Sequence, residues 1–135
     1  MPRFAPYGWV RGEKNVYIPL PAGTTAAEIV TDWVGGFDYL IESAKAYVAD
    51  VGVGIGASRT LRVLKGASTV AATGTVTEAG TATLGAETAL TVTAANAEFS
   101  DSDKLTVDFA SGGTAFTAGA LNLCIVYRQR PQRAA

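Results

Sequence analysis

The chain has 135 residues, of which 48% are hydrophobic and 17% are charged, and its net charge is -1. This composition predicts one folded domain, and it excludes a membrane span because no run of about 20 apolar residues is present. The chain has no histidine and one cysteine, Cys124, which excludes disulfides within the chain, thiolate zinc sites and His-based catalysis.

Charge is distributed unevenly along the chain. Residues 1–14 carry a net +2 and the last eight residues carry +3, so the body between them is strongly acidic. An acidic body repels phosphates, and we therefore expect no nucleic-acid partner. The first residues lack the apolar segment of a signal peptide, so we expect synthesis and use without export.

The first fourteen residues mix two prolines and two glycines with three aromatic residues. Proline and glycine interrupt regular structure, so this composition predicts an extended N-terminal arm over residues 1–14. Its large side chains either fold back on their own sheet or dock on another chain. The candidate contact residues of this arm are Arg3, Phe4, Tyr7, Trp9 and Arg11.

Two periodicities compete in the next part of the chain. Residues 15–20 alternate between polar and apolar, which is typical of a half-buried strand. Residues 26–34 have helical spacing behind a capping-box pattern, and residues 39–51 keep helical spacing as well. Local propensity alone predicts two short helices in these two segments.

The remainder of the chain has the pattern of short strands and Gly-rich turns. The tract from 66 to 97 is rich in Ala, Thr, Gly and Val, which favours pleated structure. Strands of this length at such intervals indicate an antiparallel β-sandwich or jelly roll over residues 15–130, followed by a basic tail over 131–135. The clearest predicted strands are Ser58–Lys65, Leu90–Ala94, Leu105–Phe109 and Leu121–Tyr127.

Several of these segments resemble the small β-sandwich virion proteins of tailed bacteriophages. The resemblance covers about residues 15 to 130, and one departure is Ser102 before Asp103, where the family often has glycine. It implies that residues 38–51 form a strand, so we expect an almost entirely β domain despite the helical spacing. The segments that carry it are Leu20–Thr25, Tyr47–Asp50, Ser58–Ser68, Ala95–Val107, Gly112–Thr114 and Tyr127–Arg128.

The resemblance implies a head decoration (cement) protein, a structural virion protein with no enzymatic step, no catalytic residues and no cofactor. Its implied partner is the major capsid protein on the outer capsid surface, after synthesis in the host cytoplasm. Self-association on that surface, with a trimer as one arrangement, follows from the same resemblance. The alternative is a module associated with a phage fibre or tail, or a carbohydrate-binding β-sandwich. The predicted contact residues are Arg3, Phe4, Tyr7, Trp9, Arg11, Arg128 and Arg130.

Other candidate sites carry weaker patterns. Asp101 and Asp103 could share a cation, but the EF-hand spacing is absent, so a solvated turn is the preferred interpretation and no metal is expected. Cys124 lies in an apolar strand and is interpreted as a small core residue. No spacing selects a catalytic pair among five scattered carboxylates, which are Glu42, Asp50, Glu78, Glu87 and Asp108. The aromatic residues considered for a sugar-binding platform, against core packing, are Trp33, Tyr39 and Tyr47.

Overall fold

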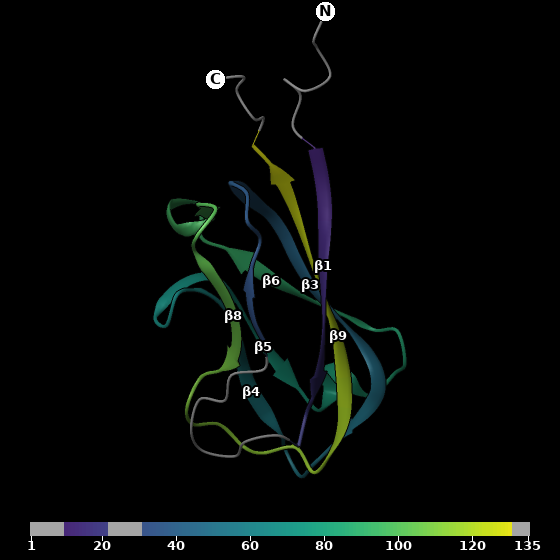
Figure 1. Cartoon of the computed structure of the whole chain (residues 1–135). Helices are drawn as coiled ribbons and strands as arrows, with labels where there is room; N and C mark the ends of the chain where they lie inside the picture. Colours follow the sequence, from purple (N-terminus) through teal and green to yellow (C-terminus); the bar gives the residue numbers. More distant parts are fainter. Residues whose placement is uncertain (1–9, 22–30, 131–135) are drawn as a thin grey trace, which may run out of the picture.

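The computed structural model describes residues 10–21 and 31–130, which form one curled antiparallel sheet (Figure 1). No α-helix occurs in these residues, so the prediction of an all-β protein is confirmed for them. None of their helical turns is long and apolar enough to cross a membrane. The elements are β1 (Val10–Pro19), β2 (Thr31–Val34), β3 (Tyr39–Val53), β4 (Ser58–Lys65), β5 (Thr69–Thr77), the 3-10 turn η2 (Ala79–Thr81), β6 (Glu87–Val92), the 3-10 turn η3 (Ala94–Asn96), β7 (Glu98–Phe99), β8 (Lys104–Phe109) and β9 (Ala118–Gln129).

The strands follow one another across the sheet in the order β1-β9-β3-β6-β5-β4-β8-β2, and the short β7 pairs with β3. Strand β6 joins the two halves, because Leu90 pairs with Ala44 of β3 whereas Thr91 pairs with Thr73 of β5. The sheet curls at this strand and its two ends approach each other. Lys14 Nζ of β1, one end strand, lies 5.4 Å from the ring centroid of Trp33 in β2, the other end strand.

The structure corrects one predicted boundary and one predicted helical segment. Strand β1 begins at Val10 and pairs with β9 along its full length. Residues 10–14 therefore belong to the sheet and not to an arm. The rest of the predicted arm, residues 1–9, lies outside the described residues, as does the tail over 131–135. The helix predicted over 26–34 is wrong for its described part, because Thr31–Val34 is a strand paired with β8. Residues 26–30 lie outside the described residues.

The segment with helical spacing at 39–51 is the long strand β3, as the resemblance implied. Its pairing with β9 is interrupted between Ile41 and Ser43 by a β-bulge. The extra residue, Glu42, shifts the alternation, so the next buried residue after Ile41 is Ala44. A spacing of three between buried residues imitates a helix in the sequence although the backbone is extended.

The core lies between the two halves of the curled sheet. Residues that alternate along each strand point inward and are almost completely buried. The largest of these apolar side chains come from six strands and one flanking position. They are Ile18, Leu20, Tyr39, Leu61, Phe99, Leu105, Phe109, Leu121, Leu123 and Ile125.

An aromatic cluster fills the space where the sheet ends approach each other. Tyr39 lies at its centre, with ring centroids 4.9 Å from Phe99, 5.3 Å from Tyr127 and 5.6 Å from both Trp33 and Phe37. The ring of Tyr127 also lies so close to β1 that position 12 has no room for a Cβ atom, which accounts for glycine there. The cluster therefore connects β2, β3, β7 and β9.

The hydroxyl of Tyr39 is buried, and no hydrogen-bond partner for it lies among the described residues. Burial raises the pKa of Tyr39 above its ordinary value, and the charges of Asp103 and Tyr127 raise it further. In the unfolded chain the Tyr39 hydroxyl ionises at about pH 10, whereas in the folded chain it is still protonated at that pH. The stability that Tyr39 contributes is therefore complete below pH 10 and is lost as the pH rises above it.

We expect Tyr39→Phe to remove the loss of stability above pH 10 that the ionisation of Tyr39 causes. At pH 7 the variant should be at least as stable as the original, by up to about 1 kcal/mol, because an unsatisfied buried hydroxyl disappears. Above pH 10 the free energy of unfolding should fall less steeply for the variant. Urea titrations followed by circular dichroism at several pH values measure both effects, and parallel pH profiles for the two proteins would contradict the assignment.

Candidate functional site

Two of the predicted contact residues, Arg11 and Arg128, lie side by side although they are far apart in the sequence. They are register partners on β1 and β9. Nε of Arg11 lies 2.9 Å from Oε1 of Glu42, and Nε of Arg128 lies 2.5 Å from Oε2 of the same carboxylate. The β-bulge at Glu42 places this carboxylate on the outer face beside both arginines. We refer to Arg11, Glu42 and Arg128 as the arginine pair site.

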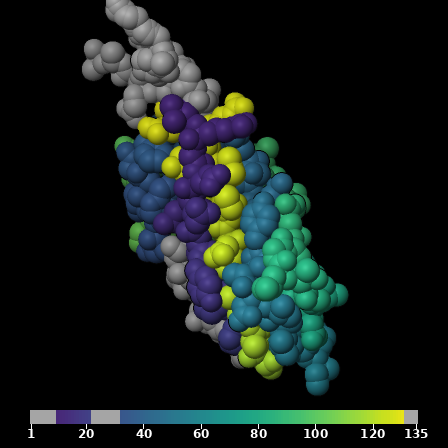
Figure 2. All heavy atoms as spheres, turned by 90° about the vertical axis from the view of Figure 1, so that its right-hand side faces the viewer, coloured from purple at the N-terminus to yellow at the C-terminus, as the bar shows by residue number. Residues whose placement is uncertain are grey.

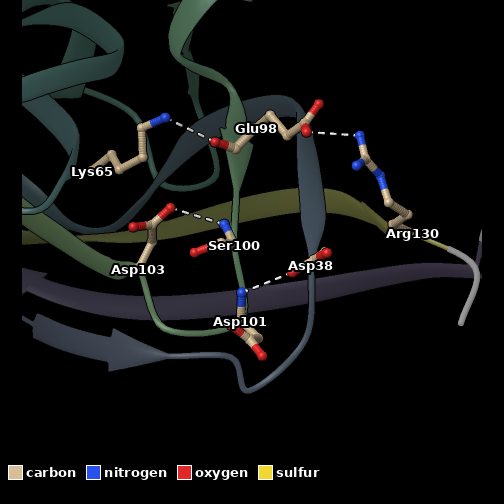
Figure 3. A network of polar contacts seen from close by, with 7 residues as sticks. All are labelled: Asp38, Lys65, Glu98, Ser100, Asp101, Asp103 and Arg130. Carbon is tan, nitrogen blue, oxygen red and sulfur yellow. Dashed lines mark hydrogen bonds and ion pairs between the residues drawn. The ribbon is translucent and has the colours of Figure 1, made fainter.

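Arg130, the third described contact residue, directly follows β9 and lies two positions after Arg128, and Figure 3 shows its contact with Glu98. Its Nη2 is 2.7 Å from Oε1 of Glu98 in β7, and its backbone N–H donates a 2.8 Å hydrogen bond to the carbonyl of Asp38. The carbonyl of Glu98 in turn accepts a 2.9 Å hydrogen bond from Nζ of Lys65. These contacts attach the end of β9 to β7 and to the turn before β3.

The structure thus brings three of the seven predicted contact residues to one end of the molecule. Figure 1 shows that the described chain enters β1 and leaves β9 at this end. The other four predicted contact residues lie outside the described residues, so their positions stay predictions. They are Arg3, Phe4, Tyr7 and Trp9.

Asp101 and Asp103 make separate contacts in the structure. Oδ2 of Asp103 accepts a 2.8 Å hydrogen bond from the backbone N–H of Ser100, which closes the turn between β7 and β8. The backbone N–H of Asp101 donates to Oδ1 of Asp38 at 2.9 Å (Figure 3). Across residues 10–21 and 31–130, no group of three or more metal-ligating His, Cys, Asp or Glu side chains occurs.

The five candidate carboxylates belong to separate contacts. Besides Glu42, Glu87 lies 3.7 Å from Nζ of Lys45, and Asp50 accepts a hydrogen bond from the backbone N–H of Val51. Each of these carboxylates therefore has a contact partner of its own. The remaining two, Glu78 and Asp108, stabilise the fold.

Asp108 forms a bidentate ion pair with its register partner Arg62. Nε and Nη2 of Arg62 donate hydrogen bonds of 2.9 and 2.8 Å to the two carboxylate oxygens. The Asp108 side chain is 5% exposed and the Arg62 side chain 27%. The hydrogen bond to Asp108 raises the pKa of Arg62 above its ordinary value, and burial lowers it by less. This pair joins β4 to β8 on the outer side of the sheet.

Glu78 holds the turn between β3 and β4. Its two carboxylate oxygens accept hydrogen bonds from the backbone N–H groups of Gly54 and Gly56, at 3.2 and 2.9 Å. The side chain between these glycines, Ile55, is fully exposed at the tip of the turn. An open hollow of about 530 Å³ lies beside this turn.

The structure separates the three aromatic residues that were considered for a sugar-binding platform. Tyr39 is buried and Trp33 half-buried in the aromatic cluster, so the prediction of core packing is confirmed for these two. Tyr47 points to solvent from β3 and is 37% exposed. A second tyrosine missed by the sequence analysis, Tyr17, is 63% exposed on β1. Its position on the polar side of the alternating 15–20 segment was the signal that could have found it.

The prediction that Cys124 is a core residue is wrong. The inward residues of β9 are its odd-numbered neighbours Leu123 and Ile125, so Cys124 lies half-buried on the outer face. Burial raises the pKa of the Cys124 thiol, and the charge of Glu13 together with a hydrogen bond to it raises the pKa further. The thiol is therefore held protonated, which does not favour a nucleophile.

Neither a known protein family nor a curated protein matches this chain. A solved structure that matches comes from work on Bacillus endospore appendages, described as a novel family of disulfide-linked pili. It is 22% identical, the match covers 98% of each chain, and the TM-score is 0.36. At that TM-score the match carries no argument about fold or function.

Proposed function

We propose that this chain is a phage capsid decoration (cement) protein that binds the outer surface of the head and stabilises contacts between major capsid protein subunits. The proposal includes synthesis in the host cytoplasm, attachment without a catalytic step, and self-association on the capsid surface. It also includes the description of the curled sheet as a β-sandwich or jelly roll with an extended N-terminal segment.

The observation that carries the proposal is the convergence of the basic chain ends. Arg11 and Arg128 are 67% and 42% exposed while they share Glu42, so both guanidinium groups are accessible to carboxylates of a neighbouring protein. Arginine suits such contacts because its planar group binds a carboxylate through two parallel hydrogen bonds. The sequence concentrates its net positive charge at the two chain ends, so the exposed arginines near these ends are the groups that suit an acidic partner surface.

The test is attachment of the purified full-length chain to heads that lack it. We expect sedimentation with the heads in many copies per particle, quantified on gels. The double variant Arg11→Ala with Arg128→Ala should reduce retention about tenfold or more, because it removes both exposed guanidinium groups. Its stability should change by less than about 1 kcal/mol, since exposed ion pairs contribute little to folding.

Lys104→Ala provides the matched control. Lys104 is also an exposed basic residue in an ion pair, 3.4 Å from Asp32, but it lies on β8, a strand that carries no residue of the arginine pair site. Its removal should leave retention unchanged. Equal loss for both variants would indicate a general charge effect, and a few copies per particle would favour the alternative of a fibre or tail module.

A further inference from the structure

A row of exposed side chains crosses three strands on the outer face of the sheet. Tyr17 of β1 and Tyr47 of β3 are both register partners of Asn122 in β9, which lies between them. Direct register partners in an antiparallel sheet point to the same face. The two tyrosines are 63% and 37% exposed, and the Asn122 side chain between them is exposed as well. We refer to Tyr17, Asn122 and Tyr47 as the tyrosine row.

The strands beneath the tyrosine row hold it in place. The neighbours of these residues along each strand, such as Ile18 and Leu121, point into the core and are completely buried. Strand β9 is paired on both sides, with β1 and with β3. Figure 2 shows this face, where β1, β9, β3 and then β6 lie side by side as an open surface. The spacing of the row is therefore set by paired strands.

The side chains of the row have the chemistry that binds sugars. The negative face of an aromatic ring attracts the C–H groups on one face of a pyranose, and the amide of Asn122 can donate to and accept from hydroxyl groups. Tyr17 and Tyr47 are two strand spacings apart, which is about 10 Å. This distance corresponds to the length of a disaccharide unit in an extended glycan. The two rings can therefore contact two sugars that are separated by one other sugar.

The charges around the row favour an uncharged ligand. The nearest charged residue on the row is Glu87, the register partner of Tyr47, and it is paired with Lys45 at 3.7 Å. The next row along the strands holds Asn15 and Cys124 beside that lysine. A phosphate or a sulfated polymer would need an excess of cations here, whereas hydroxyl groups of a neutral sugar do not.

We propose that the tyrosine row binds an uncharged polysaccharide chain that runs across β1, β9 and β3. The site is separate from the arginine pair site, because Tyr17 lies six residues along β1 from Arg11, or about 20 Å. The inference does not depend on attachment to a phage head. Of the three aromatic residues considered from the sequence, this site uses only Tyr47.

The test is affinity electrophoresis of the full-length protein in native gels that contain hydroxyethyl cellulose, a mixed-linkage β-glucan, galactomannan or dextran, with alginate as the anionic polymer. We expect at least one uncharged polymer to retard the protein. Tyr17→Ala and Tyr47→Ala should each weaken binding about five- to tenfold. Tyr17→Phe and Tyr47→Phe keep the ring and should bind within about twofold of the original.

Val34→Ala is the matched control, because Val34 is a similarly exposed apolar residue on β2, and it should not change retardation. Thermal melts check folding, and Tyr17→Thr replaces Tyr17→Ala if the latter is unstable, since threonine suits a strand. The proposal is overturned if no uncharged polymer retards the protein, if the alanine variants bind as tightly as the original, or if alginate binds best. It is also overturned if the alanine variants only dissociate a dimer, because a second copy would then be the ligand of this face.

Discussion

Phe99→Ala is expected to lower the free energy of unfolding by about 3 to 5 kcal/mol, a large part of the stability of a domain of this size. The Phe99 side chain is completely buried and stacks on Tyr39 with the ring planes 14° apart. Strand β7 contains only two residues, and Phe99 is the one whose side chain is buried. The truncation leaves a cavity in the aromatic cluster at the point where the ends of the sheet meet.

Urea unfolding followed by circular dichroism measures this loss, and near-ultraviolet circular dichroism reports the order of the aromatic cluster. Phe99→Leu is the matched control, because it keeps most of the volume and should cost less than about 1.5 kcal/mol. A loss below about 1 kcal/mol for Phe99→Ala would mean that the aromatic cluster does not hold the sheet ends together.

Asp108→Ala is expected to lower the free energy of unfolding by about 2 to 3 kcal/mol. The substitution leaves the guanidinium of Arg62 without its two carboxylate hydrogen bonds at a partly buried position. The expected loss is smaller than for a fully buried pair because the 27% exposed Arg62 can still reach solvent. Thermal and urea unfolding at pH 7 provide the measurement.

The ion pair between Asp32 and Lys104 serves as the control for Asp108→Ala. It joins β2 to β8 in the same part of the sheet, but its side chains are half or more exposed and its distance is 3.4 Å. Asp32→Ala should therefore cost less than about 0.5 kcal/mol. A double-mutant cycle on Arg62 and Asp108 should show a coupling above 1 kcal/mol, and additive losses would show that the pair contributes nothing beyond its separate side chains.

The position of the tyrosine row follows from pairing between distant segments. Its three residues come from strands that start about 30 and 80 residues apart in the chain, and no local pattern relates them. Alternation within 15–20 placed Tyr17 on the polar face, but it could not identify Asn122 as its neighbour. The inference of a glycan site therefore depends on register, which is a tertiary property.

The sequence by itself determined the class of the fold and the place of several strands. Predicted Ser58–Lys65 coincides with β4, and predicted Leu105–Phe109 differs from β8 by one residue. In these segments apolar residues recur at every second position, and β-branched or aromatic residues suit a strand. The basic character of the two chain ends was also visible in the sequence, because charge is a property of composition and not of contacts.

Only the tertiary structure decided which residues meet and which way they point. A single bulge at Glu42 changes the spacing of buried residues in β3 from two to three and brings that carboxylate to both arginines. One residue of register also decides that Cys124 points outward while Leu123 and Ile125 enter the core. The physical reason is that side chains of a strand alternate between the two faces of the sheet with a period of two. An inserted residue or a register shift of one therefore moves every later side chain to the opposite face. The partner strand that sets this register is distant in the sequence, so no local pattern reveals it.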